Sequence, residues 1–174
     1  MLKTIALVVV LLIAGVLIFA SIKPDDFRVE RVIAIKAQPA KIASHVNDFR
    51  QWPAWSPWEK LDPAMKRSFS GAPSGKGAVY VWEGSGKVGA GRMEVLEVAP
   101  LKTNIKLDFI KPFEGHNTAE FQYNPQGDST QVVWSMYGPS PFISKVMGVF
   151  FSMDSMIGKD FEAGLANLKA VAEK

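Results

Sequence analysis

The chain has 174 residues, of which 48% are hydrophobic, and this length fits one domain of ordinary size. It is too short for a TIM barrel or a two-domain dehydrogenase. Cysteine is absent, which excludes disulfides, iron–sulfur clusters and thiolate metal sites. The 20 basic and 17 acidic residues leave a net charge of only +3, without the clustered excess of a nucleic-acid-binding protein. His45 and His116 lie far apart in the sequence, so we expect no metal site. We also expect no cofactor, and the charge balance leads us to expect no nucleic-acid partner.

The start of the chain is more apolar than the rest. Residues 4–22 carry no charge, and as a helix they would reach roughly 28 Å, close to the thickness of a bilayer's hydrocarbon core. Ile18 stands where a signal-peptide cleavage site needs a small residue, which favours an uncleaved anchor over a cleaved signal. A buried soluble helix is a third interpretation, but no face of this segment is polar. We expect a transmembrane anchor over 1–22, a tether over 23–26 and one domain over 27–174.

The first part of this domain predicts a strand followed by short helices. Apolar and charged residues alternate from Phe27 to Ala37, which predicts a strand. Pro39 then opens a short amphipathic helix over 40–49. Two prolines within 51–59 exclude a long helix there and predict tight helical turns. The three tryptophans of that segment, spaced three apart, would point roughly one way.

The middle of the domain has the pattern of strands and turns. Strands are predicted over 66–70, 78–83, 89–98, 104–110, 116–123 and 131–137. Short turn signals rich in glycine and proline separate most of them. Connections this short favour an antiparallel meander over parallel strands, which need long crossovers.

From Pro141 to the end the apolar residues return to a helical period. We expect one long amphipathic helix, in which Gly148, Gly158 and Gly164 allow close approach to a sheet or a ligand rather than end it. This order predicts an α+β fold with a curved antiparallel sheet of about seven strands around one long C-terminal helix, preceded by the transmembrane helix. Such an arrangement leaves space for a ligand cavity.

Several segments carry a resemblance to a known family, and they are Arg31–Pro39 before a helix, Asn47–Pro57, Gly75–Gly77 before a strand, Thr130–Trp134 and Phe161–Leu168. Over residues 27–174 the chain resembles the START-like, or helix-grip (SRPBCC), superfamily, in its bacterial polyketide cyclase/dehydrase-like branch. The resemblance implies a helix-grip fold that binds lipids, sterols, polyketides or hormones, with cyclase activity in some members. It says nothing about the anchor, which lies outside it.

The expected location follows from the anchor and the resemblance together. Lysine and arginine occur on both sides of the apolar segment, so their counts do not favour export. An N-terminal anchor with almost nothing before it usually leaves that short tail inside. We therefore expect a single-pass protein of the bacterial cytoplasmic membrane, with its C-terminal domain outside the cytoplasm.

Ligand-facing residues are expected among the aromatic and methionine side chains of the domain. Such residues are also ordinary core, or a membrane-surface contact in the case of the tryptophans, and the resemblance is what favours a ligand role. The predicted ligand-binding residues are Trp55, Trp82, Phe109, Met147, Phe150 and Met153.

Few residues are arranged for catalysis. The candidate acid–base groups are His116, Arg92 and Tyr137, and an enzyme would need at least two of them in one pocket. The segment Gly84–Gly89 has the spacing of a dinucleotide-binding fingerprint. A strand rather than a helix is expected to follow it, so it predicts a hairpin turn.

Three functional hypotheses result. The first is a membrane-tethered binding module whose cavity holds a lipid-like or other hydrophobic small molecule. The second is a cyclase- or dehydrase-type enzyme acting on a hydrophobic substrate. The third is an interaction module at the membrane surface that uses the tryptophan region as its contact. The sequence defines no particular protein partner.

Overall fold

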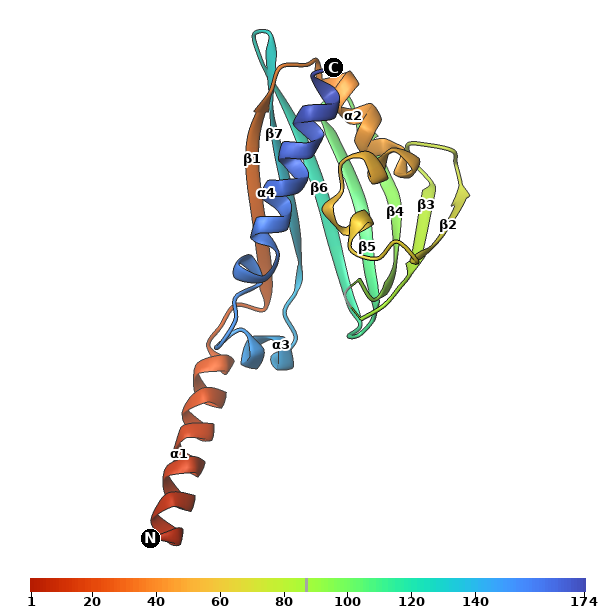
Figure 1. The fold of residues 1–174 in the computed structure, drawn as a ribbon. Helices are drawn as coiled ribbons and strands as arrows, with labels where there is room; N and C mark the ends of the chain where they lie inside the picture. The colour runs from red at the N-terminus through yellow and green to blue at the C-terminus, as the bar shows by residue number, and fades with distance from the viewer. Residues whose placement is uncertain (87) are drawn as a thin grey trace.

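The computed structural model of the chain describes residues 1–86 and 88–174. Its elements, with 3₁₀ helices labelled η, are α1 (Leu2–Ser21), β1 (Asp26–Ile35), α2 (Pro39–Asn47), η1 (Phe49–Ala54), η2 (Pro57–Lys60), β2 (Lys66–Gly71), β3 (Ala78–Glu83), β4 (Ala90–Ala99), β5 (Lys102–Lys111), β6 (Gly115–Gln126), β7 (Ser129–Pro139), α3 (Phe142–Met147) and α4 (Met153–Ala172). The strands form one 7-stranded sheet in the order β1-β7-β6-β5-β4-β3-β2 (Figure 1).

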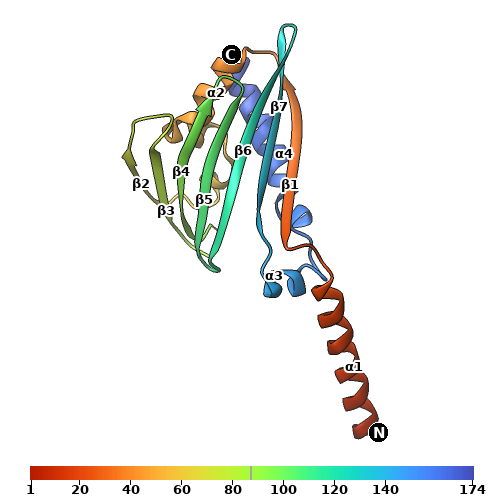
Figure 2. The same cartoon turned by 180° about the vertical axis from the view of Figure 1, so that it is seen from behind.

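The sheet is an antiparallel meander from β2 to β7, with β1 added beside β7. Val32 of β1 lies opposite Val133 of β7, for example. The helix α4 packs against β1, α2 packs against β5 and β6, and η1 packs against β3. Figure 2 shows these helices behind the sheet, on one of its faces. The predicted α+β fold, with a seven-stranded sheet and a long C-terminal helix, is therefore confirmed.

The N-terminal helix α1 projects away from this domain (Figure 1). It has a mean hydropathy of 2.9, only 6% of its most apolar window is buried, and it is the one described helix long and apolar enough to cross a membrane. The sequence-based prediction of an apolar N-terminal helix is confirmed, and this helix passes the length and composition test for a membrane span.

The tryptophans of the segment after α2 form part of the core. Trp52 is 4% exposed and Trp55 is fully buried. The ring of Trp55 meets that of Trp134 edge-on, with 5.5 Å between ring centroids, and Trp134 stacks on Phe161 of α4 at 4.1 Å. These edge-on and stacked pairs join the segment, the sheet and the long helix. The burial of Trp52 and Trp55 contradicts the hypothesis that their rings form a contact patch on the surface.

The C-terminal helical region is divided in two, which corrects the prediction of one helix from Pro141. The helix α3 ends with Gly148 as its C-cap, so this glycine does mark a helix end. The second helix begins after Ser152, whose hydroxyl oxygen accepts the Ser155 backbone N–H at 3.0 Å. Such a side-chain cap satisfies an amide that the helix leaves unpaired. Apolar periodicity alone misses this break, because the apolar stripe continues through it.

At Gly164 the prediction of close approach agrees with the structure. A Cβ there would lie 2.7 Å from the Trp134 ring and 3.2 Å from Pro57. The absence of a side chain at this position lets α4 pack directly on the sheet. The stacked contact between Trp134 and Phe161 depends on this short distance.

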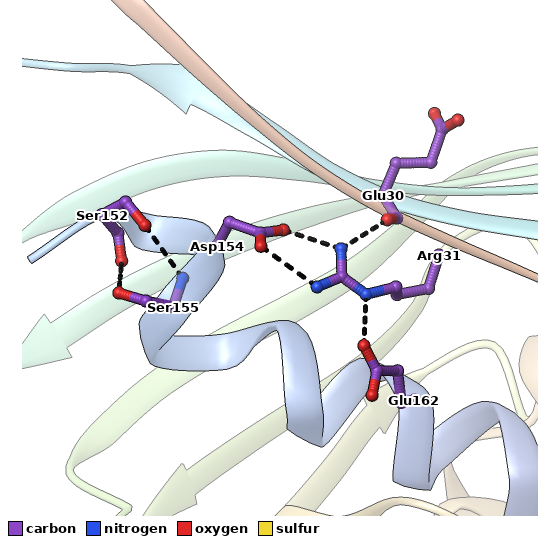
Figure 3. A network of polar contacts seen from close by, with 6 residues as sticks. All are labelled: Glu30, Arg31, Ser152, Asp154, Ser155 and Glu162. Atoms are coloured by element: carbon purple, nitrogen blue, oxygen red, sulfur yellow. Dashed lines mark hydrogen bonds and ion pairs between the residues drawn. The ribbon is translucent and has the colours of Figure 1, made fainter.

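An ionic network joins the start of α4 to β1 (Figure 3). The Arg31 guanidinium donates to Asp154 and to Glu162, both at 2.7 Å, and to the Glu30 carbonyl at 2.8 Å. The hydrogen bonds that Arg31 donates to Asp154 and Glu162 raise the pKa of Arg31, and its guanidinium lowers the pKa of Asp154. The two carboxylates are largely exposed, so the network orients α4 more than it stabilises the fold.

The segment Gly84–Gly89 precedes strand β4 rather than a helix, which removes the dinucleotide interpretation. The Gly84 backbone N–H donates to the Gly89 carbonyl at 2.9 Å. The predicted hairpin turn includes Lys87, which lies outside the described residues.

Candidate ligand-binding cavity

A cavity of about 280 Å³ lies between the sheet, the η1–η2 segment and α4. Its volume is close to the lower end of the range for small-molecule sites. Most of its wall is apolar. The lining residues are Trp52, Ser56, Trp58, Glu59, Met65, Tyr80, Trp82, Gly86, Val88, Gly89, Met93, Leu107, Phe109, Lys111, Pro112, Ala119, Trp134, Met136, Ile157 and Phe161.

Strand β3 forms one wall of the cavity, because its side chains alternate between the two faces of the sheet. Tyr80 and Trp82 are both buried, two residues apart, so both side chains face inward. The Trp82 ring lies over Gly91 of β4, where any Cβ would overlap the indole atoms. Its Nε1 donates to the Val88 carbonyl at 3.1 Å, which fixes the ring orientation. Gly91, which has no side chain, therefore leaves room for the Trp82 ring in the cavity wall.

A buried polar cluster interrupts the apolar wall. The Glu59 carboxylate accepts a hydrogen bond from the Tyr80 hydroxyl at 2.6 Å and another from Arg67 Nε at 2.6 Å. Arg67 also donates to the backbone carbonyls of Met65 and Glu59, each at 2.9 Å. The Glu59 side chain is only 5% exposed, and Arg67 is the cation that pairs with its buried carboxylate.

Two members of this cluster, Tyr80 and Arg67, have shifted pKa values. Burial and the hydrogen bond to Glu59 raise the pKa of Tyr80 well above its ordinary value. The same carboxylate raises the pKa of Arg67 through its hydrogen bond. Tyr80 is therefore a neutral phenol that keeps its proton and donates a hydrogen bond to Glu59. The lone pairs of its oxygen are left to accept from another group.

A second polar group at the cavity has no partner within the described residues. Trp134 lines the cavity and is 2% exposed, and its indole Nε1 makes no hydrogen bond there. A buried donor without an acceptor costs about 1–3 kcal/mol. An acceptor atom supplied by a bound molecule or a water would remove that cost.

The structure brings two of the predicted ligand-binding residues together and leaves four elsewhere. Trp82 and Phe109 line the cavity, with 6.0 Å between their ring centroids. Trp55 lies behind the wall, and its Nε1 donates to the His45 carbonyl at 3.1 Å. The residues outside the cavity are Trp55, Met147, Phe150 and Met153. The expectation for Met147 and Phe150 is corrected because the helix break puts both on the surface, 46% and 64% exposed.

The three candidate acid–base residues also lie outside the cavity. His116 is paired with Asp108 at 2.8 Å on the sheet, with a side chain that is 62% exposed. Arg92 donates to Glu94 at 2.7 Å. The Tyr137 ring lies under the Arg28 guanidinium, 5.1 Å from ring centroid to carbon. Strand alternation points them away from the cavity, so they do not act together in it.

Sequence reasoning missed the polar cluster and the unpaired indole. Glu59 follows the tryptophan segment, and no sequence pattern connects it to Arg67 eight positions later. Tyr80 shares the strand face of Trp82, and this period of two was the one available signal. Their association depends on how η2 folds over the end of β2 and β3.

A curved antiparallel sheet around one long C-terminal helix, with a cavity between them, defines a protein of the helix-grip class. Within that class, the chain matches the family described as polyketide cyclase / dehydrase and lipid transport over residues 26–173. The chain belongs to this family. A comparison with curated protein sequences finds no significant match.

Solved structures share the fold at low sequence identity. A protein from Chromobacterium violaceum, CV1439, has a TM-score of 0.58 and 13% identity, and the match covers 87% of this chain and 99% of that chain. The Aha1 dimer from Colwellia psychrerythraea has a TM-score of 0.60 and 15% identity, with 84% and 96% covered. The di-domain ARO/CYC protein StfQ from the steffimycin biosynthetic pathway has a TM-score of 0.62 and 10% identity, and the match covers 85% of this chain and 51% of that chain. These identities show the fold alone.

Proposed function

We propose that the protein is a membrane-anchored binding module whose cavity holds a lipid-like or other hydrophobic small molecule. Residues 1–22 are the anchor, 23–26 the tether and 27–174 the binding domain. The observation that carries the proposal is the largely apolar cavity wall, which includes the neutral phenol of Tyr80 and also Trp134, whose indole N–H has no partner among the described residues. A mostly apolar pocket with a few placed polar groups is typical of small-molecule sites.

The two polar groups narrow the kind of ligand. Tyr80 has lone pairs left for a hydrogen-bond donor, whereas the Trp134 N–H is buried and has no partner among the described residues. A hydroxyl group both donates and accepts, so an apolar molecule with one hydroxyl matches the wall better than a pure hydrocarbon.

The proposal also includes a location. The short tail before α1 is expected to remain inside a bacterial cytoplasmic membrane, which puts the domain outside the cytoplasm. The enzyme hypothesis ranks second, because its candidates His116, Arg92 and Tyr137 lie away from the cavity.

Filling the cavity is expected to abolish ligand binding. Ala119 lies at the middle of β6 on the cavity wall and is 4% exposed, so Ala119→Phe would place a ring in the space. The full-length protein in lipid nanodiscs is titrated with N-phenyl-1-naphthylamine, and energy transfer from tryptophan reports binding. We expect the affinity to fall about tenfold or more, which corresponds to about 1.4 kcal/mol or more.

The control for this titration is Leu96→Phe, which adds a ring to an exposed position outside the cavity. Its probe affinity should equal that of the wild type, and circular dichroism should show both variants folded. Met93→Trp, at another lining position, replaces Ala119→Phe if the latter does not fold. Unchanged binding in a folded, filled variant would refute a ligand in this cavity.

A further inference from the structure

The helix break exposes a cluster of large apolar side chains. Five of them fall between residues 142 and 151, and their exposed fractions range from 46% to 67%. We name this set the membrane-proximal patch, and its members are Phe142, Ile143, Met147, Phe150 and Phe151. Exposed apolar residues are ordinary when scattered, but a contiguous group marks a contact surface.

The patch is fixed beside the end of α1. The helix α3 packs against α1 (Figure 1). Lys23 Nζ, just beyond α1, donates to the Gly148 carbonyl at 2.6 Å. Lys145, which is 8% exposed, pairs with Asp25 of the tether, and this hydrogen bond lowers the pKa of Asp25. The Lys23–Gly148 and Lys145–Asp25 contacts join the tether to the segment that carries the patch, and so hold the patch beside the end of α1.

The mouth of the cavity lies at the same end of the molecule. Among the lining residues of the described chain, those that are exposed are Gly86, Lys111 and Pro112. Gly86 lies in the β3–β4 connection, Lys111 is the last residue of β5, and Pro112 follows it in the β5–β6 connection. Both views show these connections at the end that carries α3 and α1 (Figures 1 and 2). The β6–β7 turn lies at the opposite end.

We propose that the membrane-proximal patch inserts into the interfacial layer of the same bilayer that α1 crosses, and so holds the cavity mouth toward the lipid. The proposal rests on the anchor stated under the proposed function. Large apolar side chains next to a spanning helix can bury themselves at the boundary between headgroups and acyl chains. A ligand dissolved in the bilayer would then enter the cavity with little passage through water.

The absence of cysteine makes a direct test available, because a single introduced cysteine takes one spin label. The variants are Phe151→Cys in the patch, Val10→Cys at the middle of α1, and Gln126→Cys, an exposed residue at the far end of the domain. The full-length labelled protein is reconstituted in vesicles of phosphatidylcholine and phosphatidylglycerol. Power saturation then compares collisions with oxygen, which enters lipid, and with a water-soluble nickel chelate.

The oxygen-to-nickel ratio at 151 should exceed that at 126 by about threefold or more, as for an interfacial segment, with a still higher ratio at position 10. If the label at position 10 has a high oxygen-to-nickel ratio but the ratio at 151 equals that at 126, α1 spans the bilayer and the patch does not insert. That result would overturn the proposal and leave the anchor supported. If the nickel chelate collides with the label at position 10 as often as with the label at 126, α1 does not span the bilayer. That result would refute both the anchor and the insertion of the patch. Protection of 151 that depends on protein concentration in lipid-free detergent would assign the patch to a second copy and overturn the proposal.

Discussion

Arg67→Met is expected to destabilise the protein by about 3 kcal/mol, because it leaves the buried Glu59 carboxylate without its cation. Arg67 also donates to the Met65 and Glu59 carbonyls, and both bonds are lost with it. We take the lower end of the range for broken buried pairs because the Arg67 side chain is 25% exposed. Urea unfolding of the full-length protein in mild detergent, followed by tryptophan fluorescence, measures the change.

Two further variants identify the cause of that loss. Arg92→Met removes a cation from a surface pair with Glu94 and should cost less than about 1 kcal/mol. Adding Glu59→Gln to Arg67→Met removes the stranded charge and should restore part of the stability. If the double variant is no more stable than Arg67→Met, the charge of Glu59 is not what the arginine neutralises.

Phe161→Ala should have an effect of similar size for a different reason. Phe161 is 1% exposed, stacks on Trp134 at 4.1 Å and lines the cavity. Removing a buried phenyl ring typically costs about 3–5 kcal/mol, through lost burial and the space left behind. The enlarged cavity should still bind N-phenyl-1-naphthylamine in the fraction of protein that remains folded.

The matched control is Phe113→Ala, since Phe113 is 72% exposed. Its free energy of unfolding should lie within about 0.5 kcal/mol of that of the wild type. Equal losses for Phe161→Ala and Phe113→Ala would show that α4 is not held by its contact with the sheet.

The sequence predicts the architecture well because periodicity reports burial directly. Alternation in β1 and β3 and the turn residues between strands predict the meander. The long helical period predicts α4, and the uncharged start predicts α1. These signals are local, and each element can be inferred from its own residues.

The candidate site is less predictable because it depends on contacts between distant elements. Met147 and Phe150 belong to the same apolar stripe as Phe161, and only the break before Ser152 separates surface from cavity. Glu59 has no local pattern that marks it, since its role comes from Tyr80, 21 positions later. The places of Trp82 and Phe109 in the cavity wall agree with their inward-facing strand positions.

Above all, we propose that the cavity of the native protein holds a hydrophobic molecule. Native mass spectrometry of the full-length protein, purified from membranes in mild detergent, tests it most directly when wild type and Ala119→Phe are compared. We predict one bound small molecule per chain in the wild type and none in the filled variant. Equal bound mass in the two proteins, or no bound molecule in either, would contradict the claim.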